Sequence, residues 1–284
     1  MMLKEIDKGN MMKSVLITGC SSGIGLDTAL QMHSLGWKVF ASCRKEEDVA
    51  RLQALGLETL VLDVDKSEQI KAAFEAISAQ TGGTLDALFC NAGYGQTGAI
   101  EDVPREALRE QFETNVFGTW ECIHHAMKIF RHQGHGRILV NSSILGFAAM
   151  PWRGAYNSTK FALEGMCDTL RHELFNTNIQ VVLVEPGPVA TRFRPNAVVK
   201  LHQHIDIENS VHRESYHKQL ARLQTQGDTT VFTISSATCA SICVHALSTP
   251  HPRRRYLVTV PTILFWYLKR LFPTALFDKL LRKI

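Results

Sequence analysis

Short runs of apolar, often β-branched residues alternate along this 284-residue chain with longer segments in which apolar residues recur every three or four positions. The short runs are apolar throughout, which is typical of strands buried on both faces of a parallel sheet. The longer segments have the periodicity of helices. The predicted strands lie at residues 13–18, 38–42, 58–63, 85–90, 136–142, 179–185 and 255–260. The predicted helices lie at 24–35, at 66–80, from about 104, around 155–165 and near 234–247.

This order of elements predicts an α/β fold with a Rossmann-type, doubly wound sheet. Strands that alternate with helices of this length form a sheet of about seven mainly parallel strands, with helices on both faces. We expect a single domain over residues 13–260, in which 189–235 form a substrate-binding loop or lid, and then a helical C-terminal extension at 261–284. Ligands of such folds bind beyond the carboxyl ends of the strands, so the functional residues should follow the strands.

The first predicted strand is followed by a glycine-rich stretch, TGCSSGIG (18–25), that leads into a helix. Gly19, Gly23 and Gly25 lack Cβ atoms, which permits a tight turn and lets backbone amides approach a pyrophosphate at the helix N-terminus. An ordinary glycine-rich turn would have the same composition. The position of this stretch, between the first strand and a helix, favours a dinucleotide-binding site.

Small or hydrogen-bonding residues follow other predicted strands as well. Residues 91–93 (NAG) would leave room for a flat cofactor ring after the fourth strand. Ser142 and Ser143 follow the fifth strand, and a Pro-Gly turn with a threonine hydroxyl follows the sixth, within 186–191. Each of these strand ends therefore has the chemistry that a ligand site at the sheet edge requires.

Tyr156 and Lys160 stand four residues apart in AYNSTKFALEG (155–165), and Ser143 precedes Tyr156 by thirteen residues. At a spacing of four, both side chains leave the same helical face. Such a pair also occurs by chance on ordinary amphipathic helices. A free phenol has a pKa near 10 and is a poor proton shuttle at neutral pH, whereas a nearby ammonium favours the phenolate. If the pair is catalytic, we expect Lys160 to lower the pKa of Tyr156.

TGxxxGIG, NAG, a serine before Y-x-x-x-K, and PGPVAT together resemble the motifs of the short-chain dehydrogenase/reductase superfamily in its classical, single-domain branch. The resemblance covers roughly residues 13–195. The stretches LFCNAGYG, AYNSTKFALEG and VEPGPVATRF look most like those of 17β-hydroxysteroid and retinol dehydrogenases and of bacterial NADP-dependent aldehyde reductases. The cofactor-binding positions that the resemblance implies are Thr18, Gly19, Ser21, Ser22, Gly23, Ile24, Gly25, Arg44, Asp63, Val64, Asn91, Ala92, Gly93, Tyr156, Lys160, Pro186, Gly187, Val189 and Thr191.

The resemblance also implies roles in hydride transfer between a nicotinamide and a carbonyl or alcohol. Tyr156 would protonate the substrate oxygen, or deprotonate it in the reverse direction, and Lys160 would also bond the nicotinamide ribose. Ser143 would hold and polarise the substrate oxygen. Asn115, in TNVFG (114–118), matches the asparagine that supports a proton relay in the family. The alternative for Asn115 is a polar side chain that satisfies buried backbone groups.

The end of the second predicted strand, KVFASCRKEED (38–48), bears on cofactor choice. An NAD-binding enzyme usually has an acid here for the ribose 2′-hydroxyl, but Cys43 occupies that position and Arg44 follows. A guanidinium suits a 2′-phosphate by bidentate contacts, so NADP(H) is favoured over NAD(H). Ser22 departs from this pattern, because some NADP enzymes have a second basic residue there. Asp63 would lie near the adenine, as in the family.

Substrate choice is less determined. The residues between Ser143 and Tyr156 join the two catalytic positions, so they should lie near the pocket, and they are largely apolar. We therefore expect a small apolar aldehyde, ketone or alcohol as the substrate partner. The apolar residues of this segment are Ile144, Leu145, Phe147, Met150, Pro151 and Trp152.

Composition narrows the class of protein. With 45% hydrophobic and 20% charged residues, the chain is globular rather than disordered. Its seven cysteines include no C-x-x-C pair and its histidines form no H-E-x-x-H, so neither a disulfide framework nor a metal site is expected. The segment MMLKEIDKGNMMK has no apolar core of a secretory signal. With the free cysteines, this predicts a cytoplasmic protein.

The net charge of +4 arises from the C-terminal tail. Residues 253–284 contain eight of the 31 Lys and Arg residues and one of the 27 Asp and Glu residues, so the rest of the chain has 23 basic and 26 acidic residues. We expect no nucleic-acid partner. After Pro273, Leu276, Phe277, Leu280, Leu281 and Ile284 form one apolar helical face, and the apolar run ILFWYL (263–268) is too short to cross a bilayer.

Two interpretations of this tail stay open. In the first, its apolar face packs over the substrate pocket or against a second subunit of a homo-oligomer, and its basic residues are solvated. In the second, it is an interfacial helix that attaches the protein to anionic lipid as a peripheral membrane contact.

Three functions compete at this stage. The motifs favour an NADP(H)-dependent oxidoreductase. A sugar-nucleotide epimerase or dehydratase of a related fold is disfavoured by the glycine spacing and the short C-terminal half. A nucleotide-sensing or scaffold protein of the same fold would commonly have lost Tyr156 or Lys160, and both are present.

Overall fold

A seven-stranded parallel sheet forms the centre of the computed structural model, which describes residues 12–224 and 230–282. The N-terminal segment 1–11, part of the predicted lid (225–229) and the last two residues, Lys283 and Ile284, lie outside the described residues. The strand order reverses beside β1, as a doubly wound fold requires. Across the sheet the strands are β3 (Glu58–Val61), β2 (Lys38–Cys43), β1 (Ser14–Ile17), β4 (Ala87–Cys90), β5 (His135–Asn141), β6 (Asn178–Pro186) and β9 (Arg255–Val258).

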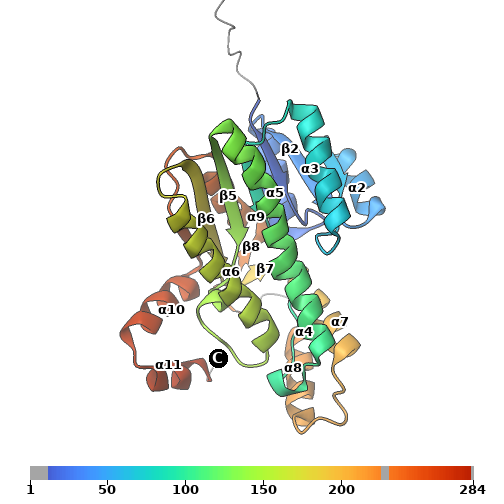
Figure 1. The fold of residues 1–284 in the computed structure, drawn as a ribbon. Helices are drawn as coiled ribbons and strands as arrows, with labels where there is room; N and C mark the ends of the chain where they lie inside the picture. The colour runs from blue at the N-terminus through green and yellow to red at the C-terminus, as the bar shows by residue number, and fades with distance from the viewer. Residues whose placement is uncertain (1–11, 225–229, 283–284) are drawn as a thin grey trace, which may run out of the picture.

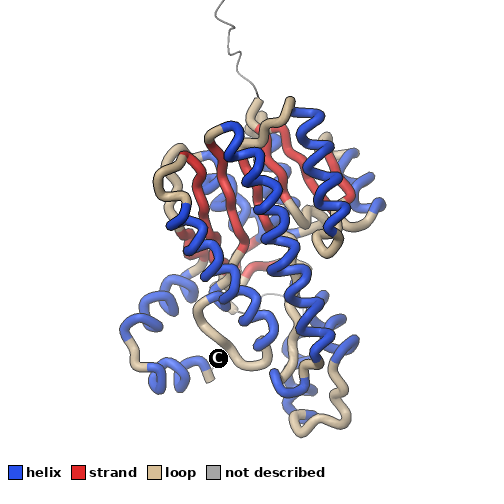
Figure 2. The backbone as a smooth tube through the Cα atoms, in the orientation of Figure 1, coloured by secondary structure: helices blue, strands red, loops and turns tan. Residues whose placement is uncertain are grey.

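Helices cover both faces of the sheet, and each face has its own apolar core. One core joins the strands to α3 (Ser67–Thr81), α5 (Gly118–Gln133) and α6 (Gly154–Glu173), which lie in front of the sheet in Figure 1. The other core joins them to α1 (Gly23–Ser34), α2 (Glu46–Gln53) and α9 (Ser236–Ser248). Figure 2 shows the strands enclosed between the two helical layers. The predicted α/β fold class is confirmed, because runs that are apolar on both sides need cover on both faces.

The long helix predicted from about residue 104 has three parts. It begins as α4 (Arg105–Phe112), passes through a π-helical turn at Glu113–Phe117, and continues as α5. A Cβ atom at Gly118 would collide with the carbonyl oxygen of Val64, so the helix and the loop after β3 approach closely only because this residue is glycine. The π turn contains Asn115, and such turns are frequent at functional sites.

The segment predicted as a loop or lid is mostly helical. It consists of β7 (Val189–Ala190), α7 (Phe193–His204), α8 (Arg213–Gln224) and β8 (Ile234–Ser235), and β7 pairs with β8. The side chains of Leu201, Ile205, Ile207 and Tyr216 form a small core of its own. The Tyr216 hydroxyl also accepts a hydrogen bond from the backbone N–H of Ala99 at 2.8 Å and donates one to Asp102 at 2.7 Å. These contacts tie the segment to the loop after β4.

The tail is helical, as predicted, and forms α10 (Val260–Leu271) and α11 (Thr274–Leu281). Phe265, Phe277 and Leu281 are buried against Ile144, Leu145 and Phe147 of the segment after β5. Of the apolar face predicted for this helix, Phe277 and Leu281 are buried, whereas Leu276 is 48% exposed. Within the described residues, no helix combines the length and apolar content that a bilayer crossing would require.

Candidate active site

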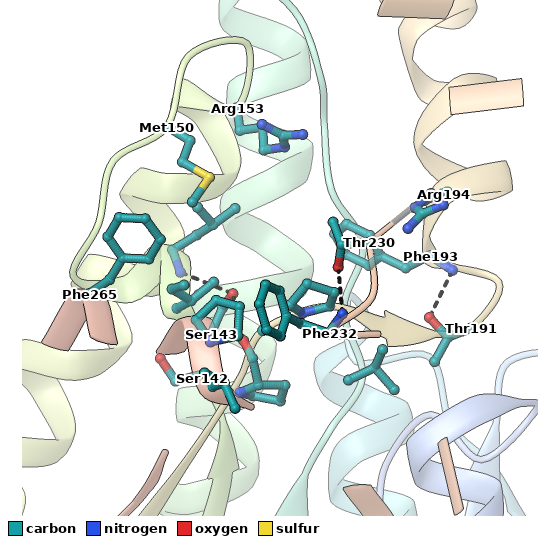
Figure 3. Close-up of a pocket in the computed structure, with 18 of the residues that line it drawn as sticks. Ser142, Ser143, Met150, Arg153, Thr191, Phe193, Arg194, Thr230, Phe232 and Phe265 are labelled. Carbon is teal, nitrogen blue, oxygen red and sulfur yellow. Dashed lines mark hydrogen bonds between the residues drawn. The ribbon is translucent and has the colours of Figure 1, made fainter. Parts of the chain in front are cut away.

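A cavity of about 710 Å³ opens at the carboxyl edge of the sheet, where the predicted site residues should gather. Its wall includes the hydroxyl-bearing residues Ser143 and Tyr156, and Figure 3 shows Ser143 directed into it. Ile24 of the glycine-rich stretch and residues of the Pro-Gly turn form another part of the wall. The predicted cofactor-binding residues that line the cavity are Ile24, Tyr156, Pro186, Gly187, Val189 and Thr191. Segments more than 160 residues apart in the chain therefore meet here.

The glycine loop has the geometry that the sequence predicts. Gly19 has a φ of +71° and Gly23 a φ of +61°, a region that favours glycine. A Cβ atom at Gly25 would lie 2.5 Å from the Asn91 amide nitrogen, and one at Gly23 would lie 3.1 Å from Thr191. Ser22 precedes α1 without capping it through its side chain, so the first amides of the helix have no side-chain acceptor from that residue.

Asn91 joins the ends of three strands. Its amide nitrogen donates to the carbonyl oxygens of Thr18 at 3.0 Å and Gly19 at 3.1 Å, and its side-chain oxygen accepts from Asn141 at 3.0 Å. The Thr18 hydroxyl accepts the backbone N–H groups of Asn91 and Ala92, both at 3.0 Å. Asn91 and Ala92 thus brace the glycine loop.

Tyr156 and Lys160 share one face of α6, and both are buried. The Lys160 Nζ atom donates to the carbonyl oxygen of Asn141 at 2.6 Å and lies 5.5 Å from the centroid of the Tyr156 ring. Ser143 begins a short helical turn, and its hydroxyl accepts from the backbone N–H of Leu145 at 3.1 Å. Ser143, Tyr156 and Lys160, the three residues predicted to be catalytic, therefore lie close to the carboxyl end of β5.

The pKa values in this arrangement differ from the prediction. Burial raises the pKa of Tyr156 above its ordinary value, and a hydrogen bond with Ser143 only partly opposes that shift. Burial lowers the pKa of Lys160 to about 8, against the opposing field of Glu164. The expectation that Lys160 lowers the pKa of Tyr156 is not met in this structure, because desolvation dominates for both groups and favours their neutral forms.

Asn115 makes three hydrogen bonds within the protein. Its amide nitrogen donates to the carbonyl oxygen of Tyr94 at 3.0 Å and to the Thr159 hydroxyl at 3.1 Å. Its side-chain oxygen accepts the backbone N–H of Tyr94 at 3.1 Å, and a Cβ atom at Gly93 would lie 3.0 Å from that oxygen. Asn115 therefore holds the NAG loop against α6, as the structural alternative predicted, while a proton relay through it stays a prediction.

Comparison with known proteins supports what this geometry indicates. The sequence model of the family described as short chain dehydrogenase matches residues 13–200. The chain belongs to the short-chain dehydrogenase family. It is 37% identical to the uncharacterised oxidoreductase YbbO of Escherichia coli K12 (98% of this chain, 97% of that protein), and 34% identical to human 17-beta-hydroxysteroid dehydrogenase type 1 (86% and 77%). A solved short-chain dehydrogenase/reductase from Burkholderia phymatum in complex with NAD superimposes with a TM-score of 0.75 at 26% identity and covers 95% of both chains.

The residues predicted to lie near the adenosine part of the cofactor follow β2 and β3 or end these strands. Arg44 is exposed, whereas Cys43 is buried and its pKa is raised to about 11, first by burial. The Asp63 side chain accepts the backbone N–H of Asp65 at 3.2 Å, and Val64 packs against the start of α5. Burial raises the pKa of Asp65, and the fields of Asp63 and Arg44 contribute smaller, opposite effects.

Arg51 is a residue of this region that the sequence analysis missed. Its guanidinium donates to the carbonyl oxygen of Ser21 at 2.6 Å and to Asp48 at 3.0 Å. Arg51 thus places a cation against the glycine loop, where the sequence analysis found no basic residue. An arginine in α2 has no motif that would single it out, since only the packing of α2 brings it to Ser21.

The substrate side of the cavity is partly as predicted. Ile144, Leu145 and Met150 line it, whereas Phe147 packs edge-on against Trp266 and Trp152 packs on Tyr216. Phe147 and Trp152 are therefore structural rather than lining residues. The predicted lid and the C-terminal tail supply further lining residues. Phe193, Arg194 and Phe232 come from the lid, and Phe265 comes from α10; Figure 3 labels all four. Leu264 of α10 lines the cavity as well.

All seven cysteines of the dehydrogenase are buried and unpaired. Among the described residues, no group of three or more His, Cys, Asp or Glu side chains is placed to hold a metal ion. Three histidines of the predicted lid lie beside carboxylates. The Nε2 atom of His204 is 3.2 Å from Glu110, and His212 and His217 contact Glu101 and Glu208.

The Asn115 contacts predict a stability effect. In Asn115→Leu, the backbone N–H of Tyr94 and the Thr159 hydroxyl lose a buried partner, so the free energy of unfolding should fall by roughly 2–4 kcal/mol. Urea titration followed by circular dichroism measures this. The matched control is Asn209→Leu at an exposed position, which should change it by less than about 0.5 kcal/mol. Equal stability of the two variants would contradict the bracing role.

Proposed function

We propose that the chain is an NADP(H)-dependent oxidoreductase that reduces apolar aldehydes or ketones, or oxidises the corresponding alcohols. The observation that carries this proposal is that Ser143 and Tyr156 share one mainly apolar cavity with Ile24 of the glycine-rich stretch and with the Pro-Gly turn. Buried, unpaired cysteines suit a reducing compartment, and they support a cytoplasmic location.

The residues of the loop fit a dinucleotide. The N-terminus of α1 has no side-chain cap from Ser22. Arg44 follows the end of β2, and Arg51 lies on α2. The side-chain oxygen of Asn141 is buried without a hydrogen-bond partner. Amides at a helix N-terminus and guanidinium groups are the usual ligands of phosphates. When bound, NADP(H) would supply or accept the hydride. The guanidinium groups favour a 2′-phosphate over a bare ribose.

The chemistry of this chain's own residues is proton transfer and orientation. Tyr156 donates its phenolic proton to the substrate oxygen, and its raised pKa keeps that proton in place at neutral pH. Ser143 donates a hydrogen bond to the same oxygen and holds it beside the phenol. Lys160 stabilises the negative charge that develops on Tyr156 while its ammonium is held by the Asn141 carbonyl. A phenol that stays protonated suits the reductive direction.

The proton donor is tested by Tyr156→Phe. This change keeps the ring and its packing against Phe193 but removes the hydroxyl. We expect kcat to fall by roughly 10²–10⁴ in an assay of NADPH oxidation with a panel of carbonyl compounds, while NADPH binding stays nearly unchanged. Tyr267→Phe, at an exposed tyrosine, is the matched control. Turnover of Tyr156→Phe near that of the wild type would refute the mechanism.

The pKa of Lys160 predicts a pH dependence. Because the lysine is cationic only below its pKa of about 8, the phenolate that forms on Tyr156 loses its stabilising charge as the pH rises through that value. For reduction, kcat/KM should therefore fall above about pH 8, since it reports the ionisations of the free enzyme. The Lys160→Met variant should have a lower kcat/KM, and its kcat/KM should not fall further above about pH 8. A wild-type profile that stays flat up to about pH 10 would contradict the assignment.

Cofactor choice is tested at Arg44. Removal of a charged hydrogen-bond donor by Arg44→Ala should weaken NADPH binding about tenfold to 100-fold and leave NADH binding nearly unchanged. Fluorescence titration measures both affinities. Lys45→Ala, next in the chain and also exposed, is the control, and the double change Cys43→Asp with Arg44→Ala should move preference towards NADH. A wild type that uses both cofactors with equal kcat/KM would contradict the proposal.

A further inference from the structure

Helix α10 exposes five large apolar side chains. They follow one another at intervals of three, one, three and four residues, which places them along one stripe of the helix. The opposite face holds the buried residues Thr262 and Phe265. The members of this α10 stripe, with their exposed fractions, are Val260 (61%), Ile263 (44%), Leu264 (53%), Tyr267 (58%) and Leu271 (74%). A contiguous exposed apolar surface of this kind marks an interaction site more often than a solvated face.

The α10 stripe is continuous with the proposed substrate cavity. Val260 and Leu264 belong to the stripe and also line the cavity, so the same side chains face the solvent and the pocket. Figure 1 shows α10 and α11 extending past the edge of the sheet, on the other side of α6 from α7 and α8. Whatever covers the stripe therefore lies at the mouth of the cavity.

The charge around the α10 stripe indicates what covers it. The two tail helices, α10 and α11, carry exposed basic residues, and Asp278 is their single acidic residue. The guanidinium of Arg270 lies 3.3 Å from the Trp266 ring centroid, which keeps that charge close to the helix surface. The rest of the chain, residues 1–252, is net acidic. The exposed basic residues are Arg270 on α10 and Lys279 and Arg282 on α11. Lys269 is also exposed, but its ammonium donates to the carbonyl oxygen of Phe147, away from the stripe.

We propose that the α10 stripe binds an anionic lipid surface and that apolar substrate enters the cavity directly from that surface. Apolar side chains bordered by Arg and Lys, with an aromatic residue among them, are what an interfacial helix needs in order to lie in the headgroup region. A second copy of the chain is a poorer occupant, because a symmetric contact would bring the same basic residues of both copies together. The lipid contact stands by itself, while the delivery of substrate rests on the proposed function.

The test uses the full chain and vesicles of two compositions. The wild type should sediment with vesicles that contain phosphatidylglycerol at low salt, and should stay in the supernatant with pure phosphatidylcholine. Tyr267→Ser with Leu271→Ser removes apolar residues that do not line the cavity, and it should abolish sedimentation. Lys279→Gln with Arg282→Gln should weaken binding about fivefold to thirtyfold. Phe175→Ser is the matched control and should bind like the wild type. Phe175 is 80% exposed and precedes the amino end of β6, at the edge of the sheet opposite the cavity.

Three outcomes would overturn the proposal. Wild-type protein that stays in the supernatant with both vesicles excludes the lipid contact. Sedimentation that the stripe variant retains assigns binding to another surface. A dimer in analytical ultracentrifugation that the stripe variant loses, without vesicle binding, makes the stripe a self-interface.

Substrate delivery is measured separately, by NADPH oxidation with a long-chain aldehyde held in the vesicles and with a short water-soluble one. The stripe variant should lose turnover of the first and keep that of the second. Equal loss of both substrates would reject delivery from lipid. If neither substrate is turned over by wild-type protein that still binds vesicles, the proposed function fails while the lipid contact stands.

Discussion

The site depends on a chain of hydrogen bonds that runs across the carboxyl ends of three neighbouring strands. Asn91 binds the carbonyl oxygens of the glycine loop, Asn141 binds Asn91, and the Asn141 carbonyl accepts the Lys160 ammonium. These bonds form only when β1, β4 and β5 are parallel and in register, because each donor and acceptor belongs to a different strand or helix. The fold thus positions α6, which carries the proposed proton donor, relative to the cofactor loop through two asparagine side chains and backbone carbonyl groups.

Burial sets the electrostatics of the same residues. The pKa values of Tyr156 and Lys160 both shift in the direction that favours the neutral form, because both side chains are buried and desolvated. Four residues beyond Lys160, Glu164 accepts from Ser142 and pairs with Arg255, which also pairs with Glu185. This buried cluster joins α6, β6 and β9. It therefore holds the beginning of the C-terminal tail at a defined place beside the site.

Because the tail is anchored there, one side of it packs against the protein while the other side stays exposed. The buried side of α10 and α11 packs on the segment between β5 and α6 and completes the cavity, as the first interpretation of the tail predicts. The exposed side of α10 is left apolar and is accompanied by basic residues. The packing of Thr262 and Phe265 on one face of α10 leaves the other face exposed. Val260 and Leu264 of that exposed face also line the cavity.

The sequence by itself determined the sheet, the positions of the glycine loop and the spacing of Tyr156 and Lys160, because apolar periodicity, glycine and a four-residue separation act on neighbours along the chain. Only the tertiary structure decided that Asn115 braces the loop at Tyr94, that Arg51 reaches Ser21, and that Leu264 lines the cavity. The direction of the pKa shift at Tyr156 also depended on it, since desolvation is set by what packs around the phenol. Contacts between segments tens of residues apart arise from the packing of whole elements, and no local pattern encodes them.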